Sequence, residues 1–316
     1  MKRLVSLLAS AMIFSAHAAA PMSTTTDSGV YRMQLGDFQV SALSDGTVTL
    51  PIDKLLTDVA PAVLHNALQH DNLKPMMEIS INAYLVNTGG KLVLIDTGAG
   101  DSFKPPVVAR AGRLQERLRN AGYTPEQVDA VLLTHIHGDH SGGLSLNGKA
   151  LFPNAQVYVD QRDAAFWLDQ RNRATAATGQ QHGFDEAQAM LGPYVKAGRF
   201  KTFDGATEIV PGVRARPAYG HTPGHSLYEV ESHGQKLLLI GDLLHAASVQ
   251  LPHPDVTIKF DVDSSQARVQ RRSALADAAR EGYWIGAAHI SYPGLGHIQA
   301  NGKDSYRWVP ANYSGW

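Results

Sequence analysis

The feature that most constrains this chain is a cluster of metal-binding side chains directly after an apolar segment. Residues 128–134, with the sequence VDAVLLT, are typical of a buried strand. Four of the next six positions carry an imidazole or a carboxylate, the ligands that suit zinc or a similar divalent ion: His135, His137, Asp139 and His140. Alternation along an extended segment places the first two on one side, and Gly138 lets the last two point toward a second centre. A histidine-rich surface loop is the alternative, which the ligand spacing after a buried strand disfavours.

Three more candidate ligands lie later in the chain. His221 opens the loop HTPGHS, Asp242 follows the apolar run KLLLI, and His289 follows the run YWIGAA; Asp96 stands in the same way after KLVLI. Polar side chains at strand ends converge at one edge of a sheet, where rigid strands position them and loops leave them accessible. Each of the three is a weak signal alone. With the first cluster they supply five histidines and two aspartates, a ligand set for two adjacent ions.

Composition excludes several other kinds of functional site. The 316 residues include 14 histidines but no cysteine, which excludes disulfides, thiolate zinc sites, iron–sulfur clusters and a cysteine nucleophile. The formal charge of −1 argues against a broad nucleic-acid surface, so no nucleic-acid partner is expected. A hydrophobic fraction of 44% is typical of a globular chain with a sizeable core.

The N-terminus has the three parts of a secretory signal peptide. Lys2 and Arg3 precede the apolar run 4–15, and Ala16-His17-Ala18 provides a cleavage site near Ala18. A membrane anchor is the alternative, but this run is too short to span a bilayer, and no other segment is long and apolar enough. We therefore expect a periplasmic or secreted protein with a signal peptide at residues 1–18, a flexible spacer at 19–29 and one domain at 30–316.

Strand and helix signals alternate through the chain. Asp45-Gly46 and Thr88-Gly89-Gly90 each separate two strand-like runs, which predicts two hairpins. Residues 107–120 have helical periodicity and stop before Gly122, and residues 263–280 form a longer amphipathic pattern that ends before Gly282. We expect a helix over each of these two ranges.

The chain resembles a known group of hydrolases. A His-x-His-x-Asp-His motif followed by a later histidine, aspartate and histidine is the pattern of metallo-β-lactamase-fold hydrolases. Nearly the whole mature chain is similar to the exported methyl parathion hydrolases of that group, through segments such as LGD at 35–37, SDGT at 44–47, DTGA at 96–99, FPNA at 152–155 and YRWVP at 306–310. Two positions depart from that family: Gly138 stands where it has a proline, and His245 where an aliphatic residue is expected near the pocket.

The resemblance implies an αββα metallo-β-lactamase sandwich, an α/β (α+β) fold in which two mixed sheets are flanked by helices. It also implies two divalent metal ions, most simply Zn²⁺. One ion would be held by His135, His137 and His221, the other by Asp139, His140 and His289, with Asp242 bridging the two. A shared carboxylate would offset the repulsion between two neighbouring cations. Asp96 would orient a ligand histidine through its second ring nitrogen, or else cap the Asp-Thr-Gly turn; His225 is expected to be structural.

The implied activity is hydrolysis. A water shared by the two ions would lose a proton near neutral pH, and the bridging hydroxide would attack a lactone, an aryl ester or an organophosphate triester. Asp139 and Asp242 would be the catalytic carboxylates. By resemblance, the substrate pocket is lined by Phe103, Trp167 and Phe184, with His245 beside it. Trp167 fits equally well as the buried face of a helix, and the family suggests a homodimer.

Three alternative functions stay open. True β-lactamases of this fold lack the bridging carboxylate and mostly use a cysteine ligand, whereas this chain has Asp242 and no cysteine. Glyoxalase II-like thioesterases share the ligand set but carry a basic substrate-binding tail. A non-catalytic exported metal-binding protein could keep the fold, although loss of catalysis usually leaves substituted ligands and this set is intact.

Overall fold

The structure is a computed structural model that describes residues 28–104, 107–176 and 181–312. The predicted signal peptide and nearly all of the predicted spacer lie outside these ranges. Within the described ranges, no helix is both long and apolar enough to cross a membrane.

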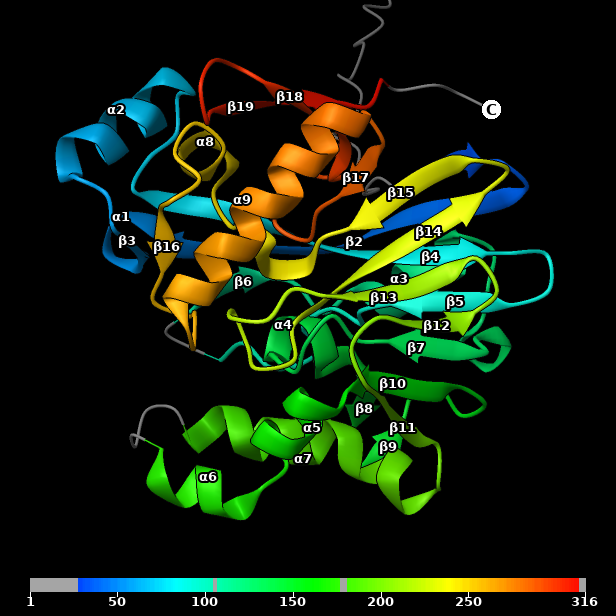
Figure 1. The fold of residues 1–316 in the computed structure, drawn as a ribbon. Coiled ribbons are helices and arrows are strands. Elements are labelled where there is room, and N and C mark those ends of the chain that lie inside the picture. Colours follow the sequence, from blue (N-terminus) through cyan, green and yellow to red (C-terminus); the bar gives the residue numbers. More distant parts are fainter. Residues whose placement is uncertain (1–27, 105–106, 177–180, 313–316) are drawn as a thin grey trace, which may run out of the picture.

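Two mixed β-sheets form the centre of the molecule (Figure 1). The first has the strand order β1-β2-β4-β5-β7-β10-β11, with β6 paired to β2. Its strands are β1 (Val30–Leu35), β2 (Phe38–Pro51), β4 (Met76–Asn87), β5 (Leu92–Ile95), β6 (Val108–Arg110), β7 (Ala130–Leu132), β10 (Gln156–Asp160) and β11 (Phe200–Phe203). The second sheet runs in order through β12 (Thr207–Val210), β13 (Val213–Pro217), β14 (Ser226–Ser232), β15 (Gln235–Leu239), β17 (Trp284–Gly286), β18 (Leu295–Ala300) and β19 (Tyr306–Pro310). Two short pairs complete the strands: β3 (Leu56–Thr57) with β16 (Thr257–Ile258), and β8 (Ser145–Leu146) with β9 (Lys149–Ala150).

The helices lie mainly on the outer faces of these sheets (Figure 1). They are α1 (Ile52–Leu55), α2 (Pro61–His70), α3 (Leu114–Asn120), α4 (Gly138–Ser141), α5 (Gln161–Trp167), α6 (Gln170–Thr175), α7 (Gln181–Lys196), α8 (Ala247–Gln250) and α9 (Ser264–Glu281), with single 3₁₀ turns at η1 (Pro125–Gln127), η2 (Gly142–Leu144) and η3 (Gly241–Leu243). Helices α3, α5 and α7 pack on the first sheet, and α9 packs on the second. This is the predicted αββα sandwich.

Strand β5 shows why its sequence is apolar at every position. Val93 and Ile95 belong to the core between the two sheets, whereas Leu92 and Leu94 belong to the core between the first sheet and its helices. A strand that is covered on both faces has no solvent-facing side, so it loses the usual alternation of apolar and polar residues.

Two of the parallel strand pairs explain why the polar residues at strand ends meet. In the first sheet β5 and β7 run parallel, with Ile95 opposite Leu132. In the second sheet β15 and β17 run parallel, with Leu239 opposite Gly286, and α9 makes the crossover between them. The residues that follow these strands therefore leave each sheet at the same edge.

One of the two predicted hairpins is confirmed and the other is wrong. Strands β4 and β5 pair antiparallel across Thr88–Gly90. Strand β2, by contrast, runs straight through Asp45-Gly46 with a register shift against β4, which is a β-bulge. The buried Asp45 carboxylate accepts hydrogen bonds from the amides of Ala99, Gly112 and Leu114 instead of capping a turn.

Of the two predicted helices, one is confirmed and the other is only partly helical. The helix over 263–280 is confirmed as α9, which ends at Gly282 in the left-handed conformation (φ +70°). The helix over 107–120 is wrong in its first half, because residues 108–110 pair with β2 as strand β6 and only Leu114–Asn120 is helical. Tertiary pairing with a sheet edge overrides helical periodicity there.

Candidate metal centre

The first group of predicted ligands comes together from both sheets. His135 Nε2 lies 3.0 Å from His137 Nδ1, which lies 3.2 Å from His221 Nε2. His221 Nε2 is in turn 3.1 Å from Asp242 Oδ2. Ligand atoms on one tetrahedral zinc ion are about 3.3 Å apart when each bond is about 2 Å. These four residues therefore have the spacing of a single metal half-site, here called the first half-site.

The second group lies on the other side of Asp242. His140 Nε2 and His289 Nε2 are 2.8 and 3.0 Å from Asp242 Oδ1, and 3.7 and 3.6 Å from Asp139 Oδ2. We call Asp139, His140 and His289, with Asp242, the second half-site. Because each oxygen of Asp242 faces a different half-site, this carboxylate has the geometry of a bridge between two ions.

The buried donor atoms of this cluster fit a bound divalent cation. His140 Nε2 and Asp242 Oδ1 are inaccessible to solvent and lie 2.8 Å apart, but this contact does not have the alignment of a hydrogen bond. Buried polar atoms are nearly always in well-aligned hydrogen bonds, so donor atoms that converge without one fit a shared cation. Neutral imidazole nitrogens and carboxylate oxygens are the donors that zinc prefers without thiolates.

Electrostatics also favour ligation. Burial lowers the pKa of His137 to about 3, which keeps its ring neutral and free to bind a metal ion. Burial alone would raise the pKa of Asp242, but the surrounding histidines, His140 foremost, hold it well below its usual range. Burial lowers the pKa of His135 as well, whereas Asp242 outweighs the effect of burial and raises the pKa of His140, His221 and His289, so these three rings would release a proton when a cation binds.

Three ligand histidines are oriented through their second ring nitrogen. His140 Nδ1 is 2.8 Å from Asp96 Oδ2, His221 Nδ1 is 2.9 Å from Asp261 Oδ1, and His289 Nδ1 is 2.9 Å from the Ser80 carbonyl oxygen. Such partners fix the ring and its tautomer. The sequence reasoning missed Asp261 and Ser80, because Asp261 follows no apolar strand and Ser80 acts through its backbone.

Asp96 takes the orienting role, the first of the two roles that the sequence left open, and its other hydrogen bonds reach Thr134 rather than the Asp-Thr-Gly turn. Besides its contact with His140, its carboxylate accepts hydrogen bonds from the amide and the hydroxyl of Thr134, each at 2.8 Å. Its backbone has φ +59°, a conformation that Asp tolerates better than most residues. His225 is placed as a supporting residue: its Nε2 accepts a hydrogen bond from the Asp242 amide, and its Nδ1 lies 3.1 Å from the Ala218 carbonyl oxygen.

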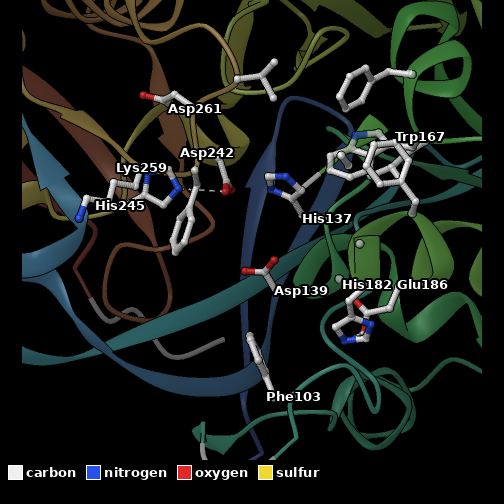
Figure 2. Close-up of a pocket in the computed structure, with 18 of the residues that line it drawn as sticks. Phe103, His137, Asp139, Trp167, His182, Glu186, Asp242, His245, Lys259 and Asp261 are labelled. Carbon is white, nitrogen blue, oxygen red and sulfur yellow. Dashed lines mark hydrogen bonds and ion pairs between the residues drawn. The ribbon is translucent and has the colours of Figure 1, made fainter. Parts of the chain in front are cut away.

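A cavity of about 670 Å³ opens beside the centre. Figure 2 shows His137, Asp139 and Asp242 at its floor, with Phe103 and Trp167 among the residues around it. Trp167 and Phe184 line the cavity and also belong to the buried core, so the pocket and core interpretations of Trp167 both apply. All four predicted pocket residues, including His245, line this cavity.

His245 lies closer to the centre than the sequence suggested. Its Nε2 is 3.1 Å from Asp242 Oδ2 (Figure 2). Its ring stacks on that of His289, with the ring centres 5.2 Å apart. The cavity wall also contains three charged or titratable residues that the sequence reasoning missed: His182, Glu186 and Lys259. They lie on α7 and on the loop after β16, and no local pattern links those segments to the metal-binding motif.

Comparison with known proteins shows which family of proteins this chain is similar to. The profile of the Metallo-beta-lactamase superfamily matches residues 77–289. The crystal structure of hydrolase AbOPH in the beta lactamase superfamily is 36% identical, with a TM-score of 0.86, over 92% of this chain and all of that chain. The structure of AidC, a dizinc quorum-quenching lactonase in complex with a product, is 25% identical, with a TM-score of 0.83, over 91% of this chain and 99% of that chain.

An N-acyl homoserine lactonase of Bacillus sp is 29% identical over 182 residues, which are 52% of this chain and 64% of that relative. The match therefore spans less than two thirds of the relative's length. The profile match covers most of the described residues and contains every predicted metal ligand. The chain belongs to the metallo-beta-lactamase superfamily.

Proposed function

We propose that this protein is a dinuclear metal-dependent hydrolase that opens lactones, and that it also accepts aryl esters and organophosphate triesters. The observation that carries the proposal is the position of Asp242, with one oxygen toward each half-site, at the floor of a cavity of about 670 Å³. Lactonases among the relatives support lactones as the first substrate class. The closer similarity to methyl parathion hydrolases stays a prediction.

The residues of the chain divide the work between holding ions and holding substrate. When bound, two divalent ions, most simply Zn²⁺, would activate a water molecule and polarise the carbonyl or phosphoryl group of the substrate. Asp242 and Asp139 supply the negative charge that keeps two cations close together. Phe103, Trp167 and Phe184 offer an apolar wall for an acyl or aryl group and exclude water from it.

The test combines metal analysis with a substrate panel. The purified protein should contain two divalent ions per chain and hydrolyse an N-acyl homoserine lactone and dihydrocoumarin faster than paraoxon, with little activity on nitrocefin. Treatment with EDTA, or His135→Ala, should abolish hydrolysis. Activity that survives both changes would overturn the proposal.

Each alternative function has its own outcome in this panel. Preference for nitrocefin would indicate a β-lactamase, and preference for a glutathione thioester would indicate a glyoxalase II-like enzyme. Two bound ions without hydrolysis of any substrate would indicate a non-catalytic metal-binding protein.

We also propose that the protein is exported and forms a homodimer. The N-terminal pattern of a basic start, an apolar run and a small-residue cleavage site supports export. N-terminal sequencing of the protein from the periplasm or medium should begin after Ala18, and light scattering should give the mass of two chains. A retained N-terminus or a monomeric mass would contradict these two proposals separately.

A further inference from the structure

Asp163 is a fully buried carboxylate that none of the functional arguments so far has used. It lies in the first turn of α5, and its two oxygens accept hydrogen bonds from two different loops. Oδ2 accepts from the Ile136 amide at 2.9 Å, and Oδ1 accepts from the Gly224 amide at 2.6 Å. Burying a carboxylate is unfavourable unless it is well paired, so this placement needs a structural reason.

The two loops that Asp163 joins both carry ligands of the first half-site. Ile136 stands between His135 and His137 in the loop after β7 of the first sheet. Gly224 follows His221 in the loop before β14 of the second sheet. His137 Nδ1 and His221 Nε2 are 3.2 Å apart although they come from different sheets, and the Asp163 carboxylate spans the same gap.

The packing of α5 against the second loop leaves no room for adjustment. A Cβ atom added at Gly224 would lie 2.5 Å from the Asp163 amide nitrogen and 3.0 Å from Asp160 Cβ. One turn further along α5, the ring of Trp167 lies 5.4 Å from the ring of His137. The start of α5 therefore contacts both ligand loops, and its end forms part of the cavity wall.

The second half-site is supported by different residues. His140 is oriented by Asp96, and His289 by the Ser80 carbonyl oxygen. The Ile136 amide lies in the same loop as His140, but the Asp163 carboxylate contacts the part of that loop between His135 and His137, before α4 begins at Gly138. The direct hydrogen-bond support of the two half-sites thus differs, although they share Asp242 and this loop.

We infer that Asp163 is a positioning residue that sets the spacing between His137 and His221 and so determines the metal affinity of the first half-site selectively. The inference rests on the proposed two-ion centre. An asparagine has nearly the same shape but only one acceptor oxygen, so Asp163→Asn would keep one loop in place and present an N–H group to the other donor.

The test measures each half-site alone. In a His289→Ala background, which leaves the first half-site, Asp163→Asn should weaken Zn²⁺ binding about 10- to 100-fold in competition with a chelating dye. In a His221→Ala background, which leaves the second half-site, the same change should not alter the affinity. Equal losses in both backgrounds, or no loss in the first, would overturn the inference.

Asp169→Asn is the matched control. Asp169 caps the next helix, α6, by accepting the Arg171 amide, a role that asparagine also fills. It should leave both affinities unchanged, whereas losses equal to those of Asp163→Asn would show a general effect of disturbing the α5–α6 segment. Gly224→Ala is the second variant if Asp163→Asn does not fold, and it should give the same selective loss.

Failure of the proposed function is distinguishable from failure of this inference. Wild-type protein that binds fewer than two ions contradicts the two-ion centre itself. Wild-type protein that binds two ions, with an Asp163→Asn variant of unchanged first-half-site affinity, contradicts only the role of Asp163.

Discussion

At the scale of single residues, the metal centre depends on side chains that touch no metal ion. The Asp261 carboxylate contacts His221 Nδ1 at 2.9 Å, and it also accepts a hydrogen bond from the Ile258 amide at 3.2 Å. Burial would raise the pKa of Asp261, but the hydrogen bond with His221 and the charge of that ring lower it overall. An ionised Asp261 favours a proton on Nδ1 of His221, which leaves Nε2 free for ligation.

Replacing Asp261 by asparagine should therefore weaken Zn²⁺ binding about 10- to 100-fold without unfolding the protein. The amide fills the same space but lacks the charge that favours the correct tautomer. Chelator competition measures the affinity, and circular dichroism checks the fold. Asp255→Asn, which alters an exposed ion pair with Arg272, is the control and should leave the affinity unchanged. Wild-type affinity in the Asp261 variant would contradict the orienting role.

Trp167 has a structural and a functional role that mutation can separate. Trp167→Ala should lower the free energy of unfolding by about 3–5 kcal/mol, because it leaves a large cavity in the core. It should also raise KM for substrates with bulky acyl or aryl groups. Phe152 lies in the same core but not on the cavity wall, so Phe152→Ala should destabilise the protein similarly with KM unchanged. Denaturant unfolding and steady-state kinetics measure the two effects, and an unchanged KM for Trp167→Ala would remove it from the pocket.

At the scale of elements, parallel strands and their crossover bring the ligands together. Helix α9 carries the chain from β15 to β17, so Asp242 and His289 leave adjacent strands at one edge of the second sheet. The helix begins at Asp263, whose side chain accepts the Gln266 amide at 3.0 Å, and ends at Gly282 in the left-handed conformation. The Gly282 signal was visible in the sequence because capping is a local property.

Gly282→Ala should lower the free energy of unfolding by about 1 kcal/mol. No atom lies within 4 Å of a Cβ built at this position, so the effect comes only from the backbone conformation (φ +70°). Gly282→Asn should cost less, since Asn tolerates that conformation better. Urea unfolding measures the difference, and equal stabilities of the alanine variant and the wild type would contradict the argument. Hydrolysis should be unchanged in both variants.

At the scale of the whole molecule, the metal centre lies where the two sheets meet. The first half-site takes His135 and His137 from the first sheet's loops, and His221 and Asp242 from the second sheet's. A bound ion would therefore link the two halves of the sandwich, and binding to the folded state alone stabilises that state.

Zn²⁺ should raise the melting temperature in a concentration-dependent way after removal of metal with EDTA. At one hundred times the dissociation constant the expected stabilisation is about 2.7 kcal/mol, which corresponds to a rise of roughly 5 °C or more. Mg²⁺ at the same concentration should have little effect, because imidazole-rich sites disfavour it. Differential scanning calorimetry tests this, and a melting temperature that does not respond to Zn²⁺ would contradict a bridging role between the sheets.

The sequence alone predicted the candidate ligand set and the edge of the fold where it gathers. An imidazole or a carboxylate directly after an apolar strand is a local pattern, so it indicated seven candidate ligands and Asp96, which the structure brings close together. It failed at Asp45-Gly46, where a turn signal stands in a continuous strand, because a partner strand and distant amides decide that conformation.

Only the tertiary structure decided which residues support the centre. Asp261, Asp163 and the Ser80 carbonyl oxygen reach their partners across about 30 to 210 positions of sequence, and none lies in a local motif. The same holds for His182, Glu186 and Lys259 on the cavity wall. A ligand is recognised by its own chemistry, whereas a supporting residue is defined by its neighbours, and those neighbours are adjacent only in the folded chain.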